Sequence, residues 1–330
     1  MPPDKDLLWL KFIHGIGDRI HHIAQAMQRA EEHDVQFLVD MRDPMFSPDG
    51  SDVFQRYFSV DHPAFVSQPD WEGLENEKDR TWVPENREVF KQKEVLPLRL
   101  CGPWLFIPGL NRPVFRTWKS VRWLTKLGQG HRCHWRLHPD FQFHCPIGHQ
   151  LHIPSAEGRT NWLYVDMVLP KTDSHRIARI LPRKEMLNRI EAQWAQDAFH
   201  PRSTLGIHIR QTDKSQDPWW QLLIEKLLRE GQHGNSTGIF VATDSWKVQQ
   251  AFRTAGFAQP VYFSPWTPLE PGEKPLHLSA TTQGIQALES ALFDLWTLTL
   301  CQHFVPTQFS SFSRVVDAWR QAGVGRKKET

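Results

Sequence analysis

Cysteine, net charge and long apolar runs are all scarce in this sequence. Because 39 basic residues stand against 37 acidic ones, the formal net charge is only +2, which excludes a strongly basic protein that coats nucleic acid. No window approaches the roughly 18–20 consecutive apolar residues of a membrane helix, and the first residues lack the pattern of a signal peptide. The four cysteines are too few and too scattered for a disulfide scaffold and fit a reducing compartment (Cys101, Cys133, Cys145 and Cys301). We therefore expect a cytoplasmic protein with no membrane span and no nucleic-acid partner.

Two catalytic motifs and one aromatic residue type are also scarce or missing. There is no P-loop, which argues against ATPases and kinases of that class, and no GxSxG elbow, which argues against Ser-His-Asp hydrolases. Tyrosine occurs three times, whereas tryptophan occurs 15 times. Such tryptophans either pack in cores and interfaces or supply the flat faces that carbohydrate sites favour, and composition does not choose between these uses. Seven of them lie between residues 71 and 162: Trp71, Trp82, Trp104, Trp118, Trp123, Trp135 and Trp162.

Histidine is abundant, with 17 residues, so a metal site has to be weighed. Zinc ligands usually come in close pairs such as CxxC or HxxxH. His134 and His138 have that spacing, but Pro139 follows directly and no helix is evident. We therefore expect a loop-rich segment and no metal at residues 131–152, whose possible ligands would be His131, Cys133, His134, His138, His144, Cys145, His149 and His152.

The N-terminal part of the chain has the pattern of a β-α-β unit. Residues 7–13 and 35–41 are short apolar runs, as expected of buried strands. Between them, a glycine-bearing turn leads into a stretch whose apolar residues recur at helical spacing: Ile20, Ile23, Ala24 and Met27. The order strand, helix, strand predicts two parallel strands joined by the helix.

The C-terminal part alternates strands and helices throughout. Strands of a sheet that are separated by helices of 10–20 residues are parallel, and the arrangement is a doubly wound, Rossmann-like sheet. The predicted strands are 205–210, 238–244, 260–264 and 303–307, and the predicted helices are 219–231, 245–256, 282–301 and 310–323, the last capped by Ser310 or Ser311.

Residues 45–170 show no clear periodicity, and only 160–170 is assigned there, as a strand. A helix at 182–199, opened by Pro182 in its first turn, is expected to join the two halves. We predict an N-terminal Rossmann-like domain at 1–180 that includes the Trp- and His-rich insert, and a C-terminal Rossmann-like domain at 181–330.

The carboxyl ends of the predicted strands carry the chemistry-bearing residues. In open parallel sheets, ligands bind beyond these ends. Arginine binds phosphate bidentately, and helix N-termini donate backbone N–H groups to anions. The predicted rim therefore suits a nucleotide; it consists of Arg210, Thr212, Asp213, Thr243, Asp244, Ser310 and Ser311 in the C-terminal half and Gly15, Gly17 and Asp18 in the N-terminal half.

Each of these features also has a purely structural interpretation. The GxG segment can be a tight turn with Asp18 as helix cap. Asp244 or Ser245 can cap the helix that follows. Arg210 can pair with Asp213. The convergence of all of them on one rim favours a ligand site.

Several stretches in the same order resemble the α-1,6-fucosyltransferases, especially the bacterial NodZ-like Nod-factor enzymes, within the superfamily of α-1,2-, α-1,6- and protein-O-fucosyltransferases. GIHIRQTDK is similar to the family's hallmark strand and turn, HGIGDRIHHIAQAMQRA with VQFLVDMRDP to its N-terminal turn, helix and strand, and LPRKEMLNRIEAQW to its linker helix. IFVATDS, PLHLSATTQGIQALESALFDLWTL and PTQFSSFSRVV are similar to its nucleotide-sugar half. The resemblance covers residues 7–44 and 176–325 and implies a GT-B-like α/β fold of two Rossmann-type domains facing a cleft.

The resemblance also implies roles for individual residues. Arg210 matches the arginine that holds the β-phosphate of GDP-fucose and stabilises the leaving group. His208 and Asp294 match positions that face the nucleotide, and Asp294 would accept from guanine. The remaining matches surround the diphosphate or the donor: Gly15, Gly17, Asp18, Asp244, His277, Ser310 and Ser311.

Two positions depart from the family pattern. Gln211 stands where the hallmark has a second arginine, and Pro218 stands where animal enzymes have a glutamate base. Inverting transfer needs a base for the acceptor hydroxyl, and we predict Asp217, with Asp213 as the second choice. The expected activity is inverting, metal-independent and cofactor-free transfer of fucose from GDP-fucose to a carbohydrate acceptor through an α-1,6 linkage; the alternatives are another nucleotide-sugar glycosyltransferase and a catalytically silent GDP-sugar- or glycan-binding protein.

Overall fold

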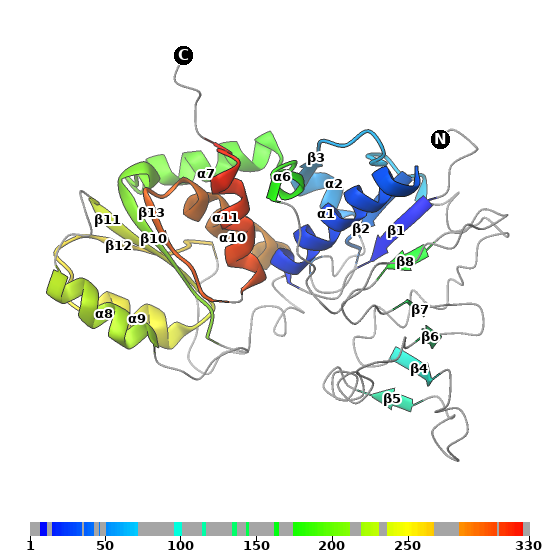
Figure 1. Ribbon diagram of the computed structural model, residues 1–330. Coiled ribbons are helices and arrows are strands. Elements are labelled where there is room, and N and C mark those ends of the chain that lie inside the picture. The colour runs from blue at the N-terminus through cyan, green and yellow to red at the C-terminus, as the bar shows by residue number, and fades with distance from the viewer. Residues whose placement is uncertain are drawn as a thin grey trace.

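The computed structural model of the chain consists of two α/β halves with further strands beside the N-terminal half (Figure 1). It describes residues 7–11, 15–34, 36–42, 46, 51–71, 96–100, 114–116, 134–136, 143–144, 162–164, 174–211, 219–230, 236–266, 284–308 and 310–325. No helix in these ranges is long and apolar enough to cross a membrane.

The predicted β-α-β unit of the N-terminal half is confirmed. Strand β1 (Leu7–Lys11) leads into helix α1 (Ile16–His33), and β2 (Gln36–Asp40) returns parallel to β1. Strand β8 (Trp162–Tyr164) pairs with the other edge of β1, also parallel, so the order is β2-β1-β8. The predicted apolar stripe of α1 is completely buried and faces the core: Ile20, Ile23, Ala24 and Met27.

The segment that joins the two halves differs in one detail from the prediction. Helix α2 (Val53–Tyr57) precedes β3 (Phe58–Val60), which pairs antiparallel with β9 (Ile180–Pro182). Pro182 is therefore the last residue of a strand, and its placement in a first helical turn is wrong. Proline is tolerated there because β9 is an edge strand of this two-stranded sheet, and the bond to the partner strand at that end comes from the next residue, Arg183, whose amide donates to the Tyr57 carbonyl at 2.8 Å. The predicted helix itself is present as α7 (Lys184–Gln196), after the short α6 (Ser174–Ile177).

The stretch without periodicity contains strands that the sequence did not reveal. They form an antiparallel sheet of order β5-β4-β6-β7, composed of β4 (Leu96–Leu100), β5 (Val114–Arg116), β6 (His134–Arg136) and β7 (Phe143–His144).

All eight elements predicted for the C-terminal half are confirmed. After a 3-10 turn, η2 (Pro201–Ser203), the chain forms β10 (Thr204–Ile209), α8 (Trp219–Glu230), β11 (Gly238–Thr243), α9 (Trp246–Thr254), β12 (Val261–Tyr262), α10 (Gly284–Leu300), β13 (His303–Val305) and α11 (Ser311–Gln321). The strands are all parallel in the order β12-β11-β10-β13. The chain therefore reverses its winding direction between β10 and β13, which is the topological switch point of a Rossmann-like sheet.

The two faces of this sheet are covered by different helices (Figure 1). On one face, Leu205, Ile207 and Ile209 of β10 pack with α8 and α9. On the other face, α10 and α11 share a larger core with α1 of the N-terminal half and with α7 of the joining segment. On that second face, a Cβ on Gly206 would lie 2.9 Å from Cys301 Sγ, so glycine is what allows α10 to approach β10. The contact of α11 with α1 brings the two halves together beside the carboxyl end of β10.

Candidate functional site

The candidate site is built around the carboxyl ends of β10 and β13. Strand β10 is buried along its whole length and ends at Ile209, so partly buried Arg210 is the first residue beyond it. Strand β13 pairs with β10 and ends at Val305, so Thr307 lies two residues beyond its carboxyl end. Arg210 thus lies at the switch point, where ligands of this type of sheet bind.

The side chain of Thr307 connects the two strand exits. Its Oγ1 donates to the carbonyl of His208 at 2.6 Å and accepts from the amide of Arg210 at 3.1 Å. The amide of Thr307 donates in turn to Ser313 Oγ at 3.1 Å. These bonds fix the backbone on both sides of Ile209 and hence the start of Arg210.

His208 is buried between strand β10 and the first turn of α11. Its Nδ1 lies 2.7 Å from Ser313 Oγ, and its ring is 4.7 Å from the ring of Phe312. Either tautomer of the imidazole fits this contact, since the serine hydroxyl both donates and accepts. His208 is therefore brought to the predicted rim, next to Arg210 in sequence and next to α11 in space.

Helix α11 begins at this rim. Ser310 is its N-cap and accepts from the amide of Ser313 at 3.5 Å, which confirms the predicted cap. The Ser310 and Ser311 side chains are buried, at 0% and 1% exposure. The amino end of the helix, with its partial positive charge, therefore lies beside the exits of β10 and β13.

The amino end of α1 packs directly against the amino end of α11. A Cβ on Gly17 would lie 2.6 Å from Phe312 N and 2.8 Å from Phe312 Cα, so only glycine permits this approach. His21 Nε2 lies 3.3 Å from the Ser311 carbonyl, and burial lowers the pKa of His21. The structure thus brings Gly17 together with Ser311, although 294 positions separate them in the sequence.

The other two residues of the N-terminal turn have different environments. Gly15 is the N-cap of α1, makes no side-chain cap, and a Cβ on it would meet nothing within 4 Å. Asp18 lies inside the first turn of α1, so the interpretation of Asp18 as the helix cap is wrong. A carboxylate in a first turn is stabilised by the helix dipole, which accounts for an acidic residue there.

The carboxyl end of β11 is tied to that of β10. Asp244 Oδ1 accepts from the amide of Gln211 at 2.9 Å. The cap of α9 is Ser245, whose Oγ accepts from the amide of Val248 at 3.4 Å, so of the two predicted caps the structure uses Ser245. Asp244 is therefore placed at the rim and holds the chain just after Arg210.

Asp294 lies on α10, in the layer that covers the sheet. Asp294 is partly exposed to solvent, but its Oδ1 is buried and has no hydrogen-bond partner within the described ranges. Burial raises the pKa of Asp294 well above its usual range. A buried carboxyl oxygen without a partner is unfavourable, so a group that donates to it would stabilise this side chain. The contacts above do not include Asp294, and its role stays a prediction.

Several predicted residues lie outside the described residues. Among them are the two candidate bases, Asp213 and Asp217, together with Thr212, Pro218 and His277. The pairing of Arg210 with Asp213 is untested for the same reason. Of the possible zinc ligands, only the strand residues His134 and His144 fall in described ranges. Within those ranges, no group of three or more His, Cys, Asp or Glu side chains could hold a metal ion.

Thr307 and Ser313 were missed by sequence reasoning. Threonine after a proline that follows a strand, and serine in the first turn of a helix, are ordinary local signals of a turn and a helix start. Their connection to His208 and Arg210 depends on β13 lying next to β10, which these local signals do not encode.

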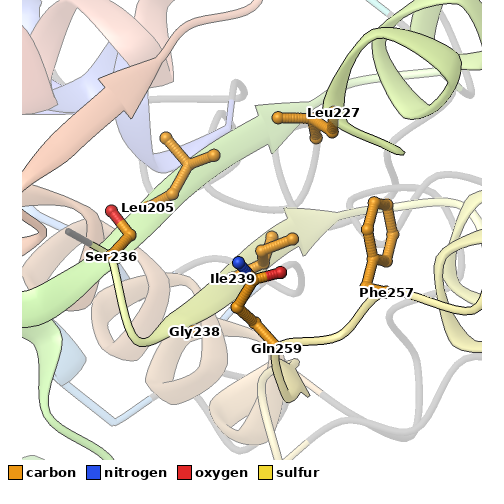
Figure 2. A pocket seen from close by; sticks show the side chains of 7 residues that line it. All are labelled: Leu205, Leu227, Ser236, Gly238, Ile239, Phe257 and Gln259. Atoms are coloured by element: carbon orange, nitrogen blue, oxygen red, sulfur yellow. The ribbon is translucent and has the colours of Figure 1, made fainter. Parts of the chain in front are cut away.

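A separate hollow lies at the other end of the strands, away from this site (Figure 2). Leu205 and Ile239, the second residues of β10 and β11, belong to its lining, so it opens at the amino ends of these strands. Its complete lining is Leu205, Leu227, Ser236, Gly238, Ile239, Phe257 and Gln259.

The fold and the rim define a class, the GT-B-like α/β proteins that have two Rossmann-type halves, and solved structures of that class are similar to the chain. The crystal structure of NodZ alpha-1,6-fucosyltransferase soaked with GDP-fucose has a TM-score of 0.54 and 17% identity, with 96% of this chain and 93% of that chain covered. Fucosyltransferase NodZ from Bradyrhizobium gives a TM-score of 0.53 and 16% identity over 95% and 92%. POFUT1 in complex with GDP gives 0.51 and 11% over 97% and 96%. No protein-family model and no curated protein matches the chain.

At these identities the similarity concerns the fold. The expected GT-B-like architecture is confirmed, and the resemblance to fucosyltransferases is confirmed at the level of the fold.

Proposed function

We propose that the chain is an inverting glycosyltransferase that moves fucose from GDP-fucose to a carbohydrate hydroxyl, through an α-1,6 linkage. The observation that carries the proposal is the position of Arg210 at the switch point between β10 and β13, beside the amino ends of α11 and α1. A guanidinium and helix amides at one rim are suited to a diphosphate. The fold that the chain shares with NodZ and POFUT1, solved with GDP-fucose or GDP, supports this choice of donor.

In this mechanism Arg210 stabilises the leaving group. As the bond between the sugar carbon and the diphosphate oxygen breaks, negative charge grows on GDP, and a fixed guanidinium favours that transition state. The acceptor hydroxyl attacks the same carbon from the opposite face and loses its proton to a base, for which Asp217 is our first choice and Asp213 our second. We place donor binding in the half at 181–330 and acceptor recognition in the half at 1–180 with its Trp- and His-rich insert.

The second candidate is a catalytically silent protein that binds GDP-sugars or glycans. Gln211 favours it, because a neutral amide stands where the family's hallmark has a second positive charge. Binding without turnover would then be the function of the same rim.

The deciding experiment supplies purified protein with GDP-fucose and a panel of glycan acceptors, and measures GDP release and fucosylated product. Arg210→Ala is expected to lower kcat by about 10²- to 10³-fold, the effect of losing one preorganised transition-state donor. Arg229→Ala is the matched control, since Arg229 is an exposed arginine in the last turn of α8. Transfer that survives Arg210→Ala would refute the role of Arg210. Wild-type protein that binds GDP but transfers nothing would favour the silent binder.

A further inference from the structure

We infer that Thr307 is a positioning residue that holds Arg210 in place for the diphosphate, an inference that rests on the proposed function. Thr307 follows β13, a strand nearly 100 residues after β10, and it is only 7% exposed. It touches the peptide groups around Arg210, so it acts through that arginine.

The geometry shows why a hydroxyl is needed at this position. Strands β10 and β13 pair in register up to Ile207 and Val305. In a regular parallel ladder, a residue of one strand bonds to the two residues that flank its partner on the neighbouring strand. Its amide donates to the carbonyl of the first, and its carbonyl accepts from the amide of the second. If this register continued, the residue opposite Ile209 would be Thr307, but the backbone amide of Thr307 donates instead to Ser313 Oγ at 3.1 Å.

The hydroxyl of Thr307 makes both bonds in place of a backbone peptide. It donates to the His208 carbonyl at 2.6 Å and accepts from the Arg210 amide at 3.1 Å. One side-chain oxygen therefore joins the two polar groups that flank Ile209, at the point where regular pairing has ended. Without it, a buried carbonyl and the amide of Arg210 would lose these bonds.

The backbone of Thr307 is itself anchored to helix α11. Its amide donates to Ser313 Oγ at 3.1 Å, and the same oxygen lies 2.7 Å from His208 Nδ1. Ser313 also belongs to the N-cap turn, since its amide donates to Ser310 Oγ. Thr307 thus sets the distance between the Arg210 exit and the amino end of α11, the two positive features that would face the diphosphate.

A conservative series tests the inference. Thr307→Val keeps the shape of the side chain and removes the hydroxyl, whereas Thr307→Ser keeps the hydroxyl. Thr299→Val is the matched control, because Thr299 is a buried threonine of α10 whose Oγ1 donates to the Leu295 carbonyl at 2.7 Å, within its own helix. All variants are first checked for folding by thermal unfolding.

Turnover of GDP-fucose gives the first readout. Thr307→Val should lower kcat by about 10- to 100-fold, as expected when a catalytic group is misplaced, with a smaller change in the KM for GDP-fucose. Thr307→Ser should stay within about 3-fold of wild type, and so should Thr299→Val. A Thr307→Val variant as active as Thr299→Val, or a Thr307→Ser variant as impaired as Thr307→Val, would overturn the inference.

Calorimetry with GDP gives the second readout and separates the two proposals. Thr307→Val should weaken GDP binding on the order of 10-fold in the wild-type background. In the Arg210→Ala background it should weaken binding by less than about 2-fold, since the contact it supports is already absent. Equal losses in both backgrounds would show that Thr307 does not act through Arg210. If wild type binds GDP but has no turnover, the transferase proposal fails while the binding cycle still decides the role of Thr307; if wild type does not bind GDP, both fail.

Discussion

Gly17→Ala is expected to damage both stability and donor binding, although alanine is normally the better helix former. In the interior of a helix, replacing glycine by alanine stabilises by up to about 1 kcal/mol. At Gly17, however, the new Cβ would lie 2.6 Å from Phe312 N, whereas an ordinary contact begins near 3.4 Å. The amino ends of α1 and α11 would therefore have to separate by 3.4 minus 2.6, or about 0.8 Å. Both partners are backbone, so no side-chain rotation relieves the contact.

The cost of such overpacking is typically about 1–3 kcal/mol. After subtraction of the helical gain, we expect Gly17→Ala to destabilise the protein by about 1–2 kcal/mol in urea unfolding. Because the displaced elements carry the amides beside Arg210, GDP affinity should fall as well. Gly15→Ala is the comparison, since a Cβ there meets nothing within 4 Å, and its effect on stability should stay below about 1 kcal/mol. If the Gly17→Ala protein were as stable as wild type and bound GDP with the same affinity, this view of the α1–α11 contact would be refuted.

Two further predictions concern the packing of the N-terminal half and its contact with α10. Tyr57 donates to Glu289 at 2.6 Å, and Arg189 donates to both oxygens of the same carboxylate at 2.6 and 3.0 Å. Tyr57→Phe should therefore lower the free energy of unfolding by about 1–2 kcal/mol. Tyr262→Phe, which changes a tyrosine on β12, is the control, and equal effects of the two substitutions would argue against the contact. Burial raises the pKa of Asp52 to about 6; because the folded state then binds the proton more tightly than the unfolded chain, the carboxyl contributes stability at low pH that is lost as the pH rises through about 6. Asp52→Asn keeps an acceptor for the amides of Phe54 and Gln55 and should therefore be more stable than wild type above pH 7, by about 1–2 kcal/mol once solvent screening is allowed for; a difference that does not shrink below pH 5 would contradict the titration.

The sequence predicted the C-terminal half well because its signals there are local and repeated. Apolar strands alternate with amphipathic helices that have clear caps, and the apolar residues of each helix recur at helical spacing. Pro182 shows the limit of such signals: proline suits a first helical turn, but the pairing of β9 with the distant β3 decided its conformation. The short strands β5, β6 and β7, of two or three residues, carry too few positions for a period to be visible.

The candidate site was predictable in its chemistry and not in its supports. Arg210 stood out because a permanently charged side chain ends a buried strand. Gly15 and Gly17 looked equivalent in the GxG turn, and only the approach of Phe312 distinguishes them. The local turn and cap signals of Thr307 and Ser313 did not mark them as site residues, because their contacts with His208 and Arg210 depend on a strand about 100 positions away. Contacts between elements that are remote in sequence are what single-sequence patterns leave out.

Gln211, which stands where the hallmark that the sequence resembles has a second arginine, is neutral but leaves the backbone after β10 held in place. The backbone amide of Gln211 donates to Asp244 at 2.9 Å, and this bond does not depend on the side chain at position 211. On the other side of Arg210, Thr307 likewise holds backbone groups. The position of Arg210 is therefore set by two neighbouring strand exits through contacts that glutamine and arginine at 211 would share. Under the proposed function, Gln211 therefore lowers the positive potential of the rim without displacing the backbone of Arg210, and the attraction for a diphosphate would come from the charge of Arg210 together with the amino ends of α1 and α11.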